Sequence, residues 1–195
     1  MPRREDVFYP GGFYHIFNRG ANRRNIFYGE DDYLRILRYT KKYAKRYQIT
    51  IIAYVLMPNH YHFLLRQDGM APVSKFVGVL FNAYVQSVNW RYDRSGTLFE
   101  SRFKHREVTT EPYLLNLIRY IHANPVLHGL IDDPGQWAYS NYLEWVGERQ
   151  GELVDRAFIA AYFDTPVAYR TFVLEYLRER DLPQSLADYL QSLDT

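Results

Sequence analysis

The sequence predicts an α+β fold in which an antiparallel sheet has helices on one face and is followed by one more helix and a helical C-terminal tail. Two observations support this prediction. Short runs rich in aromatic and β-branched residues, typical of strands, alternate with longer segments whose apolar residues recur every three or four positions, as in amphipathic helices. The 195 residues, 47% of them hydrophobic, are enough to bury a core without disulfide bonds, which a chain without cysteine cannot form.

The first half of the chain alternates strand-like and helix-like segments. Residues 13–17 form a strand-like run, and a basic loop follows them. Residues 31–47 begin with two aspartates and have lysine and arginine near their end, so both apolar spacing and charge favour a helix. Residues 49–56 and 60–66 are two more strand-like runs, separated by the turn Met57-Pro58-Asn59. We expect them to form adjacent strands.

The following segments complete a recognisable order. Residues 73–88 have helical spacing over roughly five turns, and residues 103–108 form another strand-like run. Thr109-Thr110-Glu111-Pro112 favours the start of a helix, which we expect Pro125 to end after Asn124. The order β-α-β-β-α-β-α is the split βαβ, ferredoxin-like arrangement with one additional helix.

Charge is distributed unevenly along the chain. Residues 1–130 contain 19 Lys and Arg against 10 Asp and Glu, whereas residues 131–195 contain 5 against 12. All six histidines lie in the basic part. A basic body of this kind is typical of proteins that bind a polyanion, and the many tyrosines and phenylalanines offer surfaces on which unpaired bases can stack.

Several classes of protein are disfavoured by the composition. The absence of cysteine excludes thiolate zinc sites and cysteine nucleophiles. No stretch reaches the roughly 18 apolar residues that a membrane helix needs, and no apolar run follows the charged residues at the start. We therefore expect a cytoplasmic protein without a membrane partner.

His60 and His62 lie two residues apart in an expected strand. Because side chains alternate between the faces of a strand, both imidazoles should point to one face and Tyr61 to the other. The two histidines can therefore chelate one metal ion. Their spacing alone does not distinguish a metal site from two incidental histidines.

Tyr120 and Asn124 lie four residues apart on the last helix of the basic part, so they share one helical stripe. This stripe lies beside the apolar one, which consists of Leu114, Leu117, Ile118 and Ile121. A tyrosine at such a margin can face a site between helix and sheet. The alternative is a purely structural tyrosine and an asparagine near a helix end.

Two motifs together resemble the paired signature of the REP-associated tyrosine transposases, which are relatives of the single-tyrosine HUH transposases. They are Met57-Pro58-Asn59-His60-Tyr61-His62-Phe63-Leu64-Leu65 and Tyr120-Ile121-His122-Ala123-Asn124-Pro125-Val126. Similar segments occur in the same order at Tyr14-His15-x-x-x-Arg19-Gly20, Leu98-Phe99-x-x-Arg102-Phe103-Lys104 and Trp137-x-Tyr139-Ser140-x-Tyr142. The resemblance covers about residues 8–145.

The resemblance implies a domain organisation. We expect a nuclease domain at residues 1–145 and an acidic helical extension at 146–195, where amphipathic spacing predicts two or three helices, near 152–163, 167–180 and 184–193. The extension matches no motif, and we assign no role to it from the sequence.

The resemblance also implies an activity, namely cutting and rejoining of single-stranded or hairpin DNA, with REP-type hairpins as the substrate. His60 and His62 correspond to the HUH histidines, and Asn124 corresponds to the auxiliary ligand of Mg²⁺ or Mn²⁺. Tyr120 corresponds to the nucleophile, which would form a 5′-phosphotyrosine and leave a free 3′-hydroxyl. The family often has a small or branched residue at the position of Tyr61, but a large side chain on the far face should not disturb chelation.

Other polar residues are secondary candidates. Basic residues in loop or strand positions are candidates for phosphate contact, and they are Arg19, Arg23, Arg24, Lys104 and Arg106. We expect His15, on the first strand, either to support the metal ligands or to contact phosphate. We interpret His105, His122 and His128 as surface or packing residues.

Two other functions are compatible with parts of this pattern. One is a non-catalytic module that binds single-stranded nucleic acid on the same fold by base stacking. The other is a metal-dependent nuclease that uses water and leaves no covalent adduct. The sequence does not decide between a monomer and a dimer.

Overall fold

The computed structural model describes residues 7–179 and 187–188 and contains a four-stranded antiparallel sheet. The strands are β1 (Phe13–Arg19), β2 (Ile49–Met57), β3 (His60–Gln67) and β4 (Lys104–Val108). Their spatial order is β2-β3-β1-β4, and each neighbouring pair is antiparallel. The two middle strands, β1 and β3, therefore have partners on both sides.

Helices connect and follow these strands. They are α1 (Glu30–Tyr47), α2 (Val73–Arg91), α3 (Glu111–Leu127), α4 (Tyr142–Trp145), α5 (Arg156–Tyr162) and α6 (Pro166–Glu179), with short 3₁₀ helices at Ala21–Arg23 and Pro134–Gln136. Up to α3 the order is β-α-β-β-α-β-α, so the predicted α+β, ferredoxin-like fold is confirmed.

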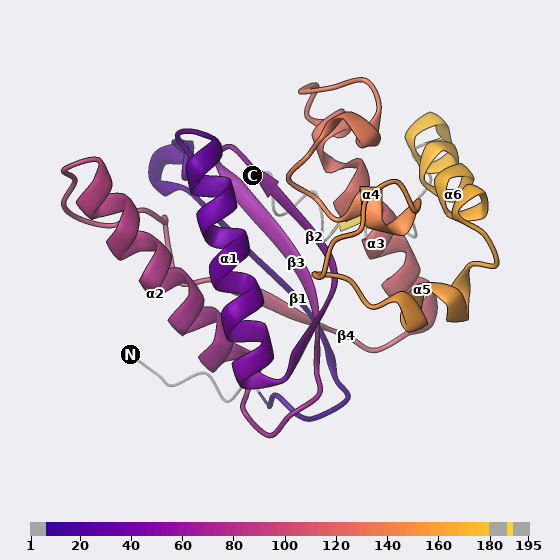
Figure 1. Cartoon of the computed structure of the whole chain (residues 1–195), viewed down its shortest axis with the longest axis horizontal. Coiled ribbons are helices and arrows are strands. Elements are labelled where there is room, and N and C mark those ends of the chain that lie inside the picture. The colour runs from indigo at the N-terminus through magenta and orange to yellow at the C-terminus, as the bar shows by residue number, and fades with distance from the viewer. Residues whose placement is uncertain (1–6, 180–186, 189–195) are drawn as a thin grey trace.

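The sheet separates two groups of helices. Figure 1 shows α1 and α2 on one side of the sheet and α3 to α6 on the other. Alternation along β3 explains how one strand serves both groups: Tyr61, Phe63 and Leu65 pack in the core with α1 and α2, whereas Leu64 packs in the core with α3. His60 and His62 share the face of Leu64, as the period of two predicts.

Helix α3 does not end after Asn124 as expected. It continues through Pro125 to Leu127. A proline lacks only one N–H, and the hydrogen bonds after it are intact, because the N–H groups of His128 and Leu130 donate to the carbonyls of Asn124 and Pro125. Pro125 is also buried, so packing offsets the lost bond.

The C-terminal helices pack against α3. Helix α5 begins at Arg156, later than expected, because the carboxylate of Asp155 caps it by accepting from the N–H of Phe158 at 3.0 Å. Helix α6 buries Tyr169, Val173 and Tyr176 in the same core as α3. The helix expected at 184–193 lies outside the described residues except for 187–188.

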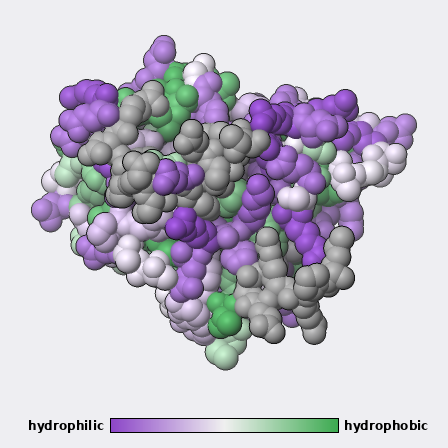
Figure 2. Space-filling model, turned by 180° about the vertical axis from the view of Figure 1, so that it is seen from behind, coloured by the Kyte–Doolittle hydropathy of each residue, from purple (hydrophilic) through white to green (hydrophobic). Residues whose placement is uncertain are grey.

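The surface is mixed in character. Seen from behind, the molecule is mostly hydrophilic, and its hydrophobic residues form separate small areas (Figure 2). Within residues 7–179 and 187–188, no helix combines the length and the apolar character required to cross a membrane.

Candidate active site

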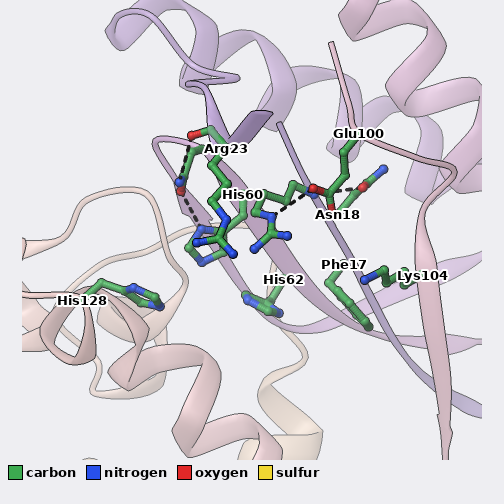
Figure 3. A pocket seen from close by; sticks show the side chains of 10 residues that line it. Phe17, Asn18, Arg23, His60, His62, Glu100, Lys104 and His128 are labelled. Atoms are coloured by element: carbon green, nitrogen blue, oxygen red, sulfur yellow. Dashed lines mark hydrogen bonds and ion pairs between the residues drawn. The ribbon is translucent and has the colours of Figure 1, made fainter. Parts of the chain in front are cut away.

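A cavity of about 290 Å³ opens where β1 ends, β3 begins and α3 ends. Figure 3 shows its polar character. Its lining consists of Phe17, Asn18, Arg19, Arg23, Asn59, His60, His62, Glu100, Lys104 and His128. We refer to it as the histidine cavity.

Strand register determines which side chains meet in this cavity. Phe17 lies opposite His62 in the pairing of β1 with β3, and it lies opposite Lys104 in the pairing with β4. Arg19 lies opposite His60. Because directly opposed residues project to the same face, these side chains all lie on the α3 side of the sheet.

A glycine shapes the loop beside the strands. A Cβ at Gly20 would lie 2.0 Å from the backbone oxygen of Arg24, so only glycine permits this close approach. The N–H of Gly20 donates to the carbonyl of Asn59 at 2.8 Å, and the Asn59 side chain donates to the carbonyl of Arg23 at 3.3 Å. These contacts hold the basic loop against the turn before His60.

The His62 ring is fixed by a third histidine. Nδ1 of His62 lies 2.9 Å from Nε2 of His15, and the two rings stack with centroids 5.1 Å apart. Since His15 occupies Nδ1, Nε2 is the nitrogen of His62 that remains for another ligand. The structure thus places His15 behind His62.

The His60 ring lies between two asparagine side chains. Its Nδ1 is 2.7 Å from Oδ1 of Asn59, and its Nε2 is 3.0 Å from Oδ1 of Asn124. The rings of His60 and His62 are 5.2 Å apart and nearly perpendicular.

Burial keeps these imidazoles neutral near pH 7. Desolvation lowers the pKa of His15 to about 3 and that of His60 to about 4. Desolvation, followed by the neighbouring histidines, lowers the pKa of His62 well below its usual value. Neutral imidazoles are the form that binds a metal ion.

Helix α3 brings the two remaining candidates to the histidines. The Tyr120 ring, only 5% exposed, meets the His62 ring edge-on with centroids 5.7 Å apart. Asn124, one turn later, is fully buried against His60. The structure therefore brings together the four residues selected from the two motifs, although His60 and Asn124 are 64 positions apart in the chain.

The basic candidates divide into two groups. Arg19, Arg23 and Lys104 line the histidine cavity, and Arg19 forms an ion pair with Glu100 at 3.1 Å. Arg24 is exposed on the loop outside the lining.

Arg106 also lies outside the cavity lining. It is opposite His15 in the pairing of β1 with β4, and its guanidinium is 5.1 Å from the centre of the Tyr113 ring.

The site also contains His128, which the sequence interpretation had assigned to the surface or to packing. It lines the cavity, and its ring centre is 5.1 Å from that of His60 (Figure 3). The signal was available, because His128 lies four residues after Asn124 and eight after Tyr120, on the same helical stripe. The expected helix end at Pro125 concealed it.

The other two histidines are in packing positions. His122 is fully buried, with Nδ1 bonded to the hydroxyl of Tyr169 and Nε2 2.8 Å from Oδ1 of Asn141. His105 packs against the rings of Phe8 and Phe103.

The donor set is compatible with a divalent cation. The described part of the chain contains no group of three or more His, Cys, Asp or Glu side chains suited to a metal, so a site here requires the amide of Asn124 besides the two histidines. Asn124 Nδ2 is buried and has no partner among the described residues. A neutral His60 can protonate only one of its nitrogens, although an amide oxygen faces each. A cation would accept the lone pairs of Nε2 and Oδ1 together and leave positions for phosphate oxygen.

The fold and the site together define a ferredoxin-like protein with a histidine pair, one buried and one partly buried, beside a tyrosine-bearing helix. The family model of IS200-like transposases matches residues 10–124, which is more than half of the chain. The chain therefore belongs to the IS200-like transposase family.

Comparison with one solved structure supports the same fold. The structure of a REP-associated tyrosine transposase bound to a REP hairpin superposes with a TM-score of 0.65 and 18% sequence identity, covering 80% of this chain and 94% of that one. The resemblance indicated by the motifs is thus confirmed. A transposase crystal structure from Deinococcus radiodurans R1 gives a TM-score of 0.43 at 17% identity, covering 62% of this chain and 95% of that one. No curated protein matches the chain.

Proposed function

We propose that this transposase cuts and rejoins single-stranded DNA with a divalent metal ion and a covalent 5′-phosphotyrosine intermediate on Tyr120. The observation that carries the proposal is the contact of Tyr120 and Asn124 with the histidine pair. The Tyr120 and His62 rings are 5.7 Å apart, and Asn124 lies 3.0 Å from His60. Tyr120 and Asn124 are not themselves lining residues, but they lie directly against His62 and His60, which line the histidine cavity.

The proposed metal ligands are Nε2 of His60, Nε2 of His62 and Oδ1 of Asn124. A bound Mg²⁺ or Mn²⁺ would offset the charge of the scissile phosphate and favour the phenolate form of a tyrosine whose unperturbed pKa is about 10. His15 holds the His62 ring in the orientation that leaves Nε2 for the ion.

Tyr120 performs the covalent step. Its phenolic oxygen forms a bond to phosphorus while the bond from phosphorus to the 3′ oxygen breaks. The phenolic proton passes to solvent, and the departing 3′ oxygen takes up a proton. Because the phosphotyrosine bond conserves the energy of the broken phosphodiester, a second 3′-hydroxyl can reverse the step without a nucleotide cofactor.

The surroundings of the cavity favour a flexible polyanion. Arg19, Arg23 and Lys104 supply positive charge for phosphates. Stacked duplex resists the bending that brings a phosphate to a buried tyrosine, whereas unpaired DNA does not. The structural relative is bound to a REP hairpin, and we propose a hairpin with an adjacent single strand as the substrate here.

The test is covalent capture on matched single-stranded, hairpin and duplex oligonucleotides with Mg²⁺ or Mn²⁺. Wild-type protein should form an adduct on the first two and little or none on the duplex. Tyr120→Phe should form none, while its folding and DNA affinity stay nearly unchanged, because only a hydroxyl is lost.

The outcomes separate the rival functions. Cleavage without an adduct would identify a hydrolytic nuclease, and binding without cleavage would identify a non-catalytic module. An adduct that persists in Tyr120→Phe would exclude Tyr120 as the nucleophile. Equal yields on duplex would overturn the substrate assignment.

A further inference from the structure

A second cavity, of about 270 Å³, lies on the opposite face of the sheet, between α2 and the segment before β4. Its walls include Tyr61, Phe81, Phe99 and Phe103, and we call it the aromatic cavity. We propose that it binds one unstacked nucleobase of the DNA strand whose backbone enters the histidine cavity. This inference rests on the proposed function and adds a base-binding site to it.

The two cavities are neighbours across one short segment. Asn18 lines both of them, and its side-chain amide donates to the carbonyl of Ser101 at 3.0 Å. Glu100 and Lys104 line the histidine cavity, whereas the three residues between them line the aromatic one. A strand held at the histidines can therefore cross this segment and place a neighbouring base in the aromatic cavity.

The walls have the chemistry that a base requires. Phe81 stacks on Tyr61 at 4.1 Å and meets Phe99 edge-on at 5.4 Å. Phe99 and Phe103 are only partly buried, and both line the cavity, so each contributes aromatic surface to it. Bases stack on such aromatic surfaces in proteins that bind single strands. Arg102, exposed at the same cavity, adds charge for the adjoining phosphate.

Tyr61, which lines this cavity, has a buried hydroxyl without a partner among the described residues. Tyr61 is 1% exposed, and its hydroxyl forms no hydrogen bond with any described residue. Burial of an unpaired hydroxyl is unfavourable, and native proteins usually satisfy such groups. A nucleobase presents ring nitrogens and exocyclic groups at its edge, so it would supply the missing partner while its faces stack.

A glycine in the cavity wall has no explanation in the folded chain itself. Gly78 lies inside α2, where glycine weakens a helix relative to alanine. Its φ is not positive, and an added Cβ would meet no described atom within 4 Å. Neither the backbone nor the packing therefore requires glycine at this wall. A bound base gives a reason, because a side chain there would extend into the space that the base occupies.

The experiment uses two substitutions at the cavity, and both should leave the fold intact. Gly78→Leu places a side chain in the open space, and Tyr61→Phe removes the unpaired hydroxyl. Gln86→Leu is the matched control, because it adds the same side chain to an exposed position two turns further along α2. All are combined with Tyr120→Phe, so that binding is measured without cleavage.

The probe is a single strand with an adjacent hairpin, carrying 2-aminopurine at one position at a time. The reference protein is the single variant Tyr120→Phe. In its complex, we expect the 2-aminopurine fluorescence to be quenched by stacking at one position of the strand. That quenching should be lost when Gly78→Leu is added. The Kd should rise at least about fivefold for Gly78→Leu and about threefold for Tyr61→Phe. The melting temperatures of both should equal or exceed that of the reference, whereas the control should bind unchanged.

Unchanged affinity and unchanged quenching in both variants would overturn the base site. A second contrary result would be that a free deoxynucleoside monophosphate competes for the cavity as effectively as the unlabelled strand does. That result would assign the cavity to a free nucleotide and would also overturn the proposed base site. These binding results do not depend on the proposed cleavage, because they are measured with Tyr120→Phe. Adduct formation is measured separately with protein that retains Tyr120. If Gly78→Leu does not fold, Gly78→Ala with Tyr61→Phe gives the same test.

Discussion

The two faces of the sheet differ in how they bury polar groups. On the α1 and α2 side, β3 contributes Tyr61, Phe63 and Leu65 to an apolar core. On the α3 side the same strand contributes His60 and His62, which have hydrogen-bond contacts from the β2–β3 turn, β1 and α3. A strand thus supplies a core with one set of alternate residues and, near its start, a site with two residues of the other set. The polar face requires partners from distant segments, because each buried unpaired group is costly.

Substitutions on the two faces of the sheet should differ most in their effect on DNA cleavage. His60→Ala or His62→Ala should reduce metal-dependent adduct formation below detection, because each removes a proposed metal ligand. His105→Ala is the matched control, since this histidine lies opposite Ile16, on the other face. In excess chelator, wild-type protein should still bind DNA through its basic surface but should not cut it. Full cleavage in chelator would exclude the metal.

The apolar face should respond in stability instead. Phe63→Ala removes a ring that is 1% exposed and that contacts the rings of Tyr54, Tyr61 and Phe81. We expect a loss of about 3–5 kcal/mol in the free energy of unfolding, measured by urea denaturation. Adduct yield per folded molecule, measured at saturating DNA, should stay close to wild type because the proposed cleavage occurs on the other face. A loss of yield much larger than the unfolded fraction would show that the faces are not independent.

A smaller effect should come from the buried link between α3 and α6. Tyr169→Phe removes the hydroxyl that bonds to His122, and it should cost about 1–3 kcal/mol of unfolding free energy because a buried ring nitrogen loses its partner. Tyr142→Phe is the control on the same side of the sheet, since its buried hydroxyl has no partner among the described residues. It should leave stability unchanged or raise it. Equal losses in both variants would refute the link.

The smallest effect concerns single charges at the cavity. Lys104→Ala and Arg24→Ala each remove one positive charge, but only Lys104 lines the histidine cavity. We expect Lys104→Ala to weaken DNA binding several-fold and to reduce its salt dependence by about one charge. Arg24→Ala should change both quantities less. Identical effects, measured by titration at several salt concentrations, would mean that overall charge rather than cavity position governs binding.

Local rules predicted much of the site. The period of two placed His60 and His62 on one face, and the spacing of four placed Tyr120 beside Asn124, as the structure has them. The predicted end of α3 was wrong, because tertiary packing outweighed a local sequence rule. Proline was expected to end α3, but its buried position allows the helix to continue and brings His128 to the cavity.

The sequence by itself determined the order of the elements and which side chains share a face, because both depend on the short periods of helices and strands. Only the tertiary structure decided which faces meet. The contact of His15 with His62 spans 47 positions, and the same separation divides His122 from Tyr169 on α6. Such contacts depend on strand register and helix docking, which are set by packing of the whole core rather than by any local pattern.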